Sequence, residues 1–181
     1  CTWSYDGLIN EYKEDCAVLV HGEISMQKSM SGLESVRTSI GNLEAFYTSG
    51  GTAHTLTTMK NRGVKNCCYK TLRYPGHHNI VNFLIHESGL DDETLIEIFK
   101  KTCPPQEDLV VIKVQVDDVL SGGGILSFQK VIKSDSQFSA MQKATAFPIA
   151  SAAHTVSLSH TYKPVLKYDD IEYPQFNKWL E

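Results

Sequence analysis

The chain has 181 residues, and 17 Lys and Arg against 21 Asp and Glu give it a formal net charge of −4 at pH 7. Hydrophobic residues make up 41% and charged residues 21%, values that exclude a disordered, collagen-like or coiled-coil chain. The negative charge argues against nucleic-acid binding, and no apolar run approaches the ~20 residues of a membrane helix. The composition predicts one folded domain with neither nucleic acid nor a membrane as partner.

The cysteines favour a reducing compartment. They are odd in number, form no CxxC pair and stand at Cys1, Cys16, Cys67, Cys68 and Cys103. A structural zinc site needs two closely spaced pairs, so this spacing predicts no metal site. Buried free thiols in a reducing cytoplasm are the simplest interpretation, and we expect a cytoplasmic protein.

The first half of the chain combines short helical and extended segments. The step His21-Gly22 predicts the turn of a hairpin, and Pro75-Gly76 ends a strand because proline cannot extend a hydrogen-bonded ladder. The expected elements are a helix over 4–13, strands over 16–20 and 23–30, a loop over 31–41, a strand over 43–48, helical turns over 52–60 and a strand over 64–72.

The second half begins with two helices and continues with two long strands. The expected elements are helices over 77–87 and 92–101, strands over 109–116 and 125–132, a helix over 136–160 that Pro148 kinks, and a terminal helix over 169–180. Strands joined by tight turns outnumber strand–helix–strand crossovers. This predicts an α+β fold with a mixed, largely antiparallel sheet and helices packed on one face.

The run 69–77, Tyr-Lys-Thr-Leu-Arg-Tyr-Pro-Gly-His, is the most informative stretch. On a strand, Arg73 shares a face with Tyr69, whereas Lys70 lies on the opposite face. A helix that begins at His77 presents free backbone N–H groups, and Arg73 can bind a carboxylate through two parallel hydrogen bonds. The run predicts an anion-binding pocket, and an ordinary turn after a solvated strand face is the alternative.

A second candidate is the turn 48–51, Thr-Ser-Gly-Gly, after a predicted strand. Consecutive glycines let the backbone come close to a ligand. The turn is neither a G-x-G-x-x-G dinucleotide motif nor a G-x-S-x-G nucleophile elbow. It therefore predicts a binding turn, with a plain strand-to-helix connection as the alternative. The Gly-rich segment 121–124 fails the same tests and is expected to be a flexible hairpin loop.

Four segments together resemble the saccharopine dehydrogenase-like family. Residues 3–12 resemble the segment where that family leaves its dinucleotide domain, and 42–51 resemble its G-x-L-E-A-F-x-T-S-G run. Residues 69–77 resemble its Y-K-T-L-R-Y-P-G-H run, and 138–148 its A-M-x-x-T-x-x-P helix. The matches keep the family's order and span nearly the whole chain. The family includes saccharopine, lysine 6- and carboxynorspermidine dehydrogenases.

The resemblance implies that residues 1–181 are the substrate-binding and dimerisation domain of a two-domain dehydrogenase. The sequence lacks the Gly-rich phosphate loop of the Rossmann domain, which would hold most of the NAD or NADP. The expected reaction is oxidation at the CH–NH group of an amino acid or its secondary-amine adduct, by a homodimer. Asp6 stands where some fungal-type saccharopine reductases have an Arg. Substrates shorter than saccharopine are therefore also expected candidates. A non-catalytic dimerisation or ligand-binding module is the alternative.

The resemblance also implies roles for residues of the matched runs. Arg73 would bind a substrate carboxylate, and His77 would orient the substrate and is one candidate for proton transfer. Lys70 is the other candidate, although its predicted strand face counts against it. The remaining substrate-binding residues implied by the resemblance are Thr48, Ser49, Gly50 and Tyr69.

Overall fold

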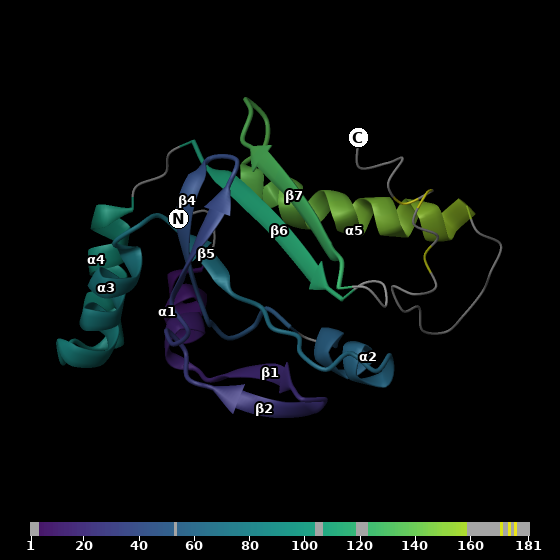
Figure 1. Cartoon of the computed structure of the whole chain (residues 1–181). Helices are drawn as coiled ribbons and strands as arrows, with labels where there is room; N and C mark the ends of the chain where they lie inside the picture. Colours follow the sequence, from purple (N-terminus) through teal and green to yellow (C-terminus); the bar gives the residue numbers. More distant parts are fainter. Residues whose placement is uncertain are drawn as a thin grey trace. The chain divides into compact units, whose positions relative to one another are not determined.

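The computed structural model describes residues 4–52, 54–103, 107–118, 123–158, 171, 174 and 176, and they form two compact units. One unit holds the described residues up to Cys103 and the other those from Glu107 (Figure 1). The predicted α+β class is confirmed, because helices combine with three small antiparallel sheets among these residues. Cys1, residues 121 and 122 of the loop 121–124 and most of the predicted helix over 169–180 lie outside the described residues.

The first unit contains the predicted N-terminal elements and one further strand. Its elements are α1 (Tyr5–Lys13), β1 (Cys16–Val20), β2 (Glu23–Gln27), β3 (Glu34–Thr38), β4 (Gly41–Phe46), α2 (Thr55–Asn61), β5 (Thr71–Arg73), α3 (His77–Asn82), a π-helical turn (Phe83–Glu87) and α4 (Asp92–Thr102).

The hairpin of β1 and β2 forms where the sequence predicts it. His21 and Gly22 have φ values of 52° and 85°, the left-handed conformations that a two-residue type I′ turn requires. The next hairpin corrects the predicted loop over 31–41, because β3 pairs antiparallel with β4 there. Gly41, with φ of 113°, permits the tight turn, and the Thr38 hydroxyl donates to its carbonyl at 2.6 Å.

Strand β5 pairs with β4, and this pairing places Arg73 beside Glu44. The register places Glu44 opposite Arg73, Ala45 opposite Leu72 and Phe46 opposite Thr71. The predicted strand over 64–72 shortens to β5, preceded by a single antiparallel bridge between Leu19 and Cys67.

Helices α1, α3 and α4 share a hydrophobic core with β4. The Asp91 carboxylate accepts a hydrogen bond from the Thr94 backbone N–H at 2.9 Å and caps α4, which starts at the predicted residue. The core residues are each 9% exposed or less, and they are Ile9, Tyr12, Met30, Phe46, Val81, Ile85, Leu95 and Phe99.

The second unit contains β6 (Leu109–Asp117), β7 (Ile125–Lys133) and α5 (Ala140–Leu158). The strands pair antiparallel along their full length, and Figure 1 shows α5 alongside this hairpin. Helix α5 begins later than the predicted residue 136, at a capping box in which Ser139 and Gln142 exchange hydrogen bonds of 2.9 and 3.1 Å. Pro148 lies inside α5 without ending it. No helix in the described parts of the chain is long and apolar enough to cross a membrane.

Candidate functional site

The two predicted motifs meet at the last turn of α1. The Ser49 backbone N–H donates to the Glu11 carbonyl at 3.0 Å, and the Ser49 hydroxyl donates to the Asn10 carbonyl at 3.5 Å. On the other side, Nε of Arg73 donates to the Tyr12 hydroxyl at 2.9 Å. Three consecutive residues of α1 therefore connect the turn 48–51 to the strand that carries Arg73.

The Arg73 guanidinium, near the last turn of α1, is not paired with a carboxylate of the described residues. Its Nη1 donates to the Leu72 carbonyl at 3.2 Å, and its guanidinium lies 5.9 Å from the centroid of the Tyr12 ring. Within the described residues no carboxylate forms a salt bridge with Arg73. Because a guanidinium binds a carboxylate in a fixed two-pronged geometry, this half-buried side chain is suited to an anionic ligand.

Tyr12 joins Arg73 to His77. Its side chain is 0% exposed, and its hydroxyl lies 3.0 Å from Nε2 of His77 as well as beside Nε of Arg73. Nε of arginine can only donate, so the Tyr12 oxygen accepts there and we assign its own proton to Nε2 of a neutral His77. Burial is the main cause that raises the pKa of Tyr12, although Arg73 opposes it. We call these three residues the Tyr12 network.

His77 is neutral at physiological pH. Its ring stacks on Phe46 with centroids 6.3 Å apart and an interplanar angle of 17°. Burial, followed by the charge of Arg73, lowers the pKa of His77 from 6.5 to about 4. A general acid or base works best with a pKa near the working pH, so this environment suits hydrogen bonding better than proton transfer.

The turn 48–51 is packed against Tyr69. A Cβ built on Gly51 would lie 2.0 Å from Cδ1 of Tyr69, so the ring occupies the place of a side chain. Gly50 is exposed, with φ of 84°, a conformation that glycine adopts without strain. The Thr48 hydroxyl is buried, with Thr48 only 1% exposed, and has no hydrogen-bond partner among the described residues. Tyr69 and the turn thus lie together, as the proposed binding roles require.

Glu44 corrects the prediction of free backbone N–H groups at the start of α3. Its two carboxylate oxygens accept from the backbone N–H groups of Gly76 and His78 at 2.7 and 3.0 Å, and the His77 N–H donates to the Tyr74 carbonyl at 3.2 Å. The cause is the strand register, which places Glu44 opposite Arg73 and next to the helix start. The backbone N–H groups of Gly76, His77 and His78 are therefore already bonded, and Arg73 remains the prediction for anion binding.

The hydrogen bonds of Glu44 to the backbone of Gly76 and His78 predict that the protein loses stability at acidic pH. The two backbone hydrogen bonds hold the pKa of Glu44 below its ordinary value of 4.5. A carboxylate whose pKa is lower in the folded state than in the unfolded state stabilises the fold. This contribution is complete at pH values above the unfolded-state pKa and is lost as the pH falls through the folded-state pKa. We expect Glu44→Gln to lower the melting temperature at neutral pH, and the difference from wild type to shrink below about pH 4.5.

Thermal unfolding followed by circular dichroism from neutral to acidic pH measures this effect. Glu14→Gln is the matched control, because the exposed Glu14 carboxylate has no hydrogen bond or ion pair within the described residues. A difference between wild type and Glu44→Gln that stays constant down to acidic pH would contradict the expected role.

Lys70 belongs to a different set of contacts. Its Nζ donates to the Gly32 carbonyl at 2.6 Å and to Glu34 Oε1 at 2.9 Å, and it lies 4.7 Å from the centroid of the Tyr47 ring. None of these partners belongs to the Tyr12 network. The structure thus separates Lys70 from Arg73, although Lys70 precedes β5 and does not lie on the opposite face of a strand as predicted.

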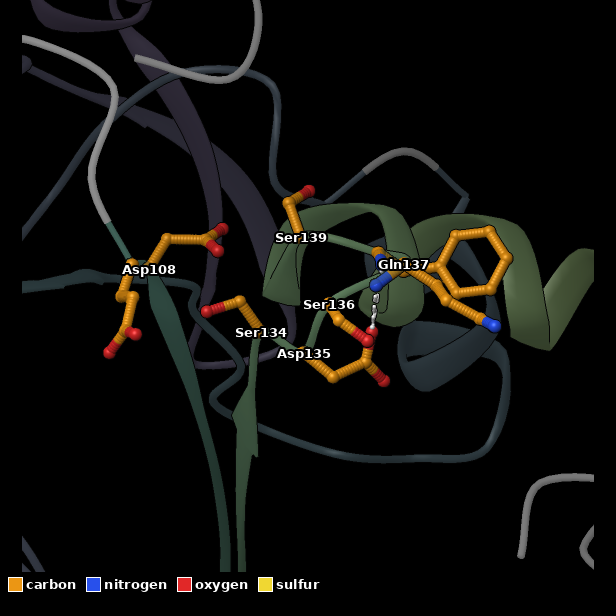
Figure 2. A pocket seen from close by; sticks show the side chains of 8 residues that line it. Asp108, Ser134, Asp135, Ser136, Gln137 and Ser139 are labelled. Carbon is orange, nitrogen blue, oxygen red and sulfur yellow. Dashed lines mark hydrogen bonds between the residues drawn. The ribbon is translucent and has the colours of Figure 1, made fainter.

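A hollow of about 280 Å³ lies in the second unit, at the start of α5. Figure 2 shows Asp108, Asp135 and Gln137 among its lining residues. Asp108 accepts from the backbone N–H groups of Ala140 and Met141 at 2.8 and 3.1 Å, so its carboxylate caps α5. No predicted site residue lines the hollow. Asp135 accepts from the backbone N–H groups of Gln137 and Phe138, both at 2.8 Å, and pairs with Lys143 at 2.6 Å, so Asp108 and Asp135 are both engaged in structural contacts.

A comparison with protein-family models gives a match over residues 1–180, to the family described as the saccharopine dehydrogenase C-terminal domain. The chain belongs to this family. The match covers all four segments whose resemblance the sequence reveals. The described residues of this saccharopine dehydrogenase C-terminal domain contain no cluster of three or more His, Cys, Asp or Glu side chains able to hold a metal ion.

Sequence reasoning misses two side chains of the site in this saccharopine dehydrogenase C-terminal domain, Tyr12 and Glu44. Tyr12 lies in the matched segment 3–12, but there its position predicts only an apolar helix residue. The available signal is the hydroxyl itself, because a buried tyrosine normally needs a hydrogen-bond partner. Glu44 gives no local signal, since the backbone groups it binds lie 32 and 34 residues further along the chain.

Proposed function

We propose that this saccharopine dehydrogenase C-terminal domain binds the amino-acid substrate of an NAD(P)-dependent dehydrogenase that acts on CH–NH groups. The supporting observation is the half-buried Arg73, which has no carboxylate partner within the described residues and is held by Tyr12 beside the turn 48–51. A fixed guanidinium next to an exposed glycine turn suits a small ligand that carries a carboxylate.

Arg73 binds a substrate carboxylate in this proposal. Gly50 offers an exposed backbone to the other end of the substrate. The neighbouring Thr48 and Ser49 are buried, and Ser49 anchors the turn to α1 through its hydrogen bonds to the Asn10 and Glu11 carbonyls. The Tyr69 ring, which is 40% exposed, forms a side of the site. These contacts hold the substrate in one orientation, which is how a binding domain contributes to catalysis.

His77 acts in this proposal chiefly through Tyr12. A neutral imidazole accepts a hydrogen bond from the Tyr12 hydroxyl, and this bond keeps the hydroxyl oxygen directed at Nε of Arg73. His77 remains the candidate for proton transfer that adjoins the cation, whereas Lys70 is bound to Glu34. We therefore propose His77 as an orienting residue first and a proton acceptor second.

NAD or NADP does not fit a phosphate site within this chain. The sequence contains no G-x-G-x-x-G motif, and every strand pair in the described residues is antiparallel, unlike the parallel strands of a dinucleotide-binding unit. We propose that a Rossmann domain elsewhere in the protein holds most of the cofactor. The nicotinamide supplies the hydride chemistry when it is bound.

A homodimerisation module is the second candidate function, and the hairpin β6–β7 supports it. Alternating positions place its apolar side chains on one face, with Val114 opposite Phe128 and Val116 opposite Leu126. Together with Ile112 these residues are 37–60% exposed, and a second copy of the chain is the occupant we propose. Sedimentation velocity then gives a dimer, and a monomer contradicts this candidate.

The cysteines support a proposed cytoplasmic location. Cys16, Cys67 and Cys68 are free thiols in the structure. Free thiols are the usual state in a reducing compartment.

Oxidation assays on the full-length protein test the proposed function. Saccharopine, L-lysine and carboxynorspermidine are each supplied with NAD⁺ and with NADP⁺, and the absorbance of the reduced nicotinamide is followed. We expect turnover of at least one of these substrates with one of the cofactors. A protein that binds NAD⁺ or NADP⁺ but oxidises none of the three would contradict the proposal and favour the dimerisation module.

A further inference from the structure

We propose that Glu11 binds the α-ammonium group of the amino-acid substrate while Arg73 binds its α-carboxylate. The inference rests on the proposed function and adds the recognition of the amino group, for which no residue is assigned above. It makes the site specific for a complete amino-acid head group instead of any carboxylate.

The backbone carbonyl of Glu11 is held by hydrogen bonds from two other segments of the chain. Its carbonyl accepts the Ser49 backbone N–H at 3.0 Å and the Ser29 hydroxyl at 2.9 Å. The next residue is Tyr12, whose hydroxyl binds Arg73. Glu11 thus stands on a rigid helical turn between the turn 48–51 and the cation, where a recognition residue can hold a defined position.

The Glu11 carboxylate borders an open position at Gly50. A Cβ built on Gly50 would lie 3.7 Å from Oε1 of Glu11, so a side chain there would occupy the space beside the carboxylate. Gly50 is exposed, which leaves this space accessible. The glycine whose substrate-binding role the family resemblance implies is therefore a neighbour of Glu11.

Glu11 and Arg73 carry opposite charges but form no salt bridge with each other. Within the described residues, the Glu11 carboxylate has neither a hydrogen bond nor an ion pair. Burial raises the pKa of Glu11, and the charge of Arg73 opposes that rise. The two side chains are linked through Tyr12, which follows Glu11 in α1 and accepts from Nε of Arg73 at 2.9 Å. Neither half-buried charge has an ion-pair partner within the described residues, so both remain open to a ligand.

The chemistry of the ligand follows from this pair of charges. An α-amino acid carries an ammonium and a carboxylate on one carbon, so it can satisfy Glu11 and Arg73 together. A dicarboxylate without nitrogen would face Glu11 with a like charge, which is unfavourable. The pair therefore selects against carboxylic acids that lack the amino group.

Binding of two matched probes to the 181-residue chain tests this inference by NMR titration. L-norleucine carries both head-group charges, whereas hexanoate has the same carbon chain and carboxylate but no ammonium. Because a hydrogen bond to a charged group is among the stronger ones, we expect norleucine to bind about 10- to 100-fold more tightly than hexanoate. Glu11→Gln should remove most of this difference by weakening norleucine and leaving hexanoate unchanged or slightly tighter.

Glu11→Asp and Glu14→Gln complete the experiment. Glu11→Asp keeps the charge and should restore part of the preference, whereas Glu14→Gln alters an exposed carboxylate in the same stretch and should leave it unchanged. Equal weakening of both probes by Glu11→Gln overturns the inference, because Glu11 would then only support the fold or Arg73. An unchanged preference in that variant overturns it too. If wild type binds neither probe, the proposed function itself fails and the inference fails with it.

Discussion

Replacing Arg73 with alanine is expected to lower kcat/KM of the full-length enzyme by about 30- to 700-fold, equivalent to about 2–4 kcal/mol. The guanidinium is the cation of the site without a carboxylate partner in the described residues, and Tyr12 holds it in place at 2.9 Å. Removing it leaves the substrate carboxylate without its ion pair in a half-buried position. Steady-state kinetics with the substrate identified by the oxidation assays measures the loss.

Two further variants separate the role of Arg73 from general effects of charge. Arg73→Lys keeps the charge but not the planar two-pronged geometry, so we expect an intermediate loss. Arg62→Ala removes an exposed arginine that follows α2 and should leave kcat/KM unchanged. If kcat/KM of Arg73→Ala equals that of wild type, Arg73 does not belong to the site.

Replacing Phe46 with alanine is expected to lower the free energy of unfolding of the first unit by about 3–5 kcal/mol. Phe46 is 0% exposed and lies in the core shared by β4 and the helices. Its ring also packs against Tyr12 at 6.2 Å, His77 at 6.3 Å and His78 at 5.1 Å between centroids. A cavity at this position therefore weakens the core and the support of the Tyr12 network together.

Urea unfolding followed by far-UV circular dichroism measures the loss at Phe46. Phe83→Ala is the matched control, because that phenylalanine is 55% exposed and its removal should change the free energy of unfolding by less than about 0.5 kcal/mol. A loss at Phe46 no larger than at Phe83 would contradict the assignment of Phe46 to the core.

Local patterns in the sequence predict much of this fold. The two ends of α4 are predicted almost to the residue, because capping and helix-dipole preferences are local. The signals are the acidic residues Asp91–Glu93 at its start and the lysines at 100 and 101 at its end. The step His21-Gly22 gives the first hairpin for a similar reason. Strand β3 is missed, since its polar sequence resembles a loop and its pairing with β4 depends on a turn at Gly41.

The candidate site is predicted in part from the strand period. That period places Arg73 and Tyr69 apart from Lys70, and their contacts are separate in this way, although Tyr69 and Lys70 precede β5. Tyr12 and Glu44 are not predicted, because their partners are brought together by the packing of α1 and the β4–β5 register. The hydrogen bond from Arg73 to Tyr12 joins residues 61 positions apart, a separation that no local pattern encodes.

The side-chain Nε–H resonance of Arg73 tests the central claim most directly. In an NMR titration of the 181-residue chain with the substrate identified by the oxidation assays, we expect this resonance to shift and to saturate as the carboxylate binds. The matching carboxamide of the substrate, which lacks the negative charge, should produce little shift. Saturable shifts elsewhere in the chain with an unchanged Arg73 Nε–H signal would show that the substrate binds away from Arg73 and would contradict the assignment of this site.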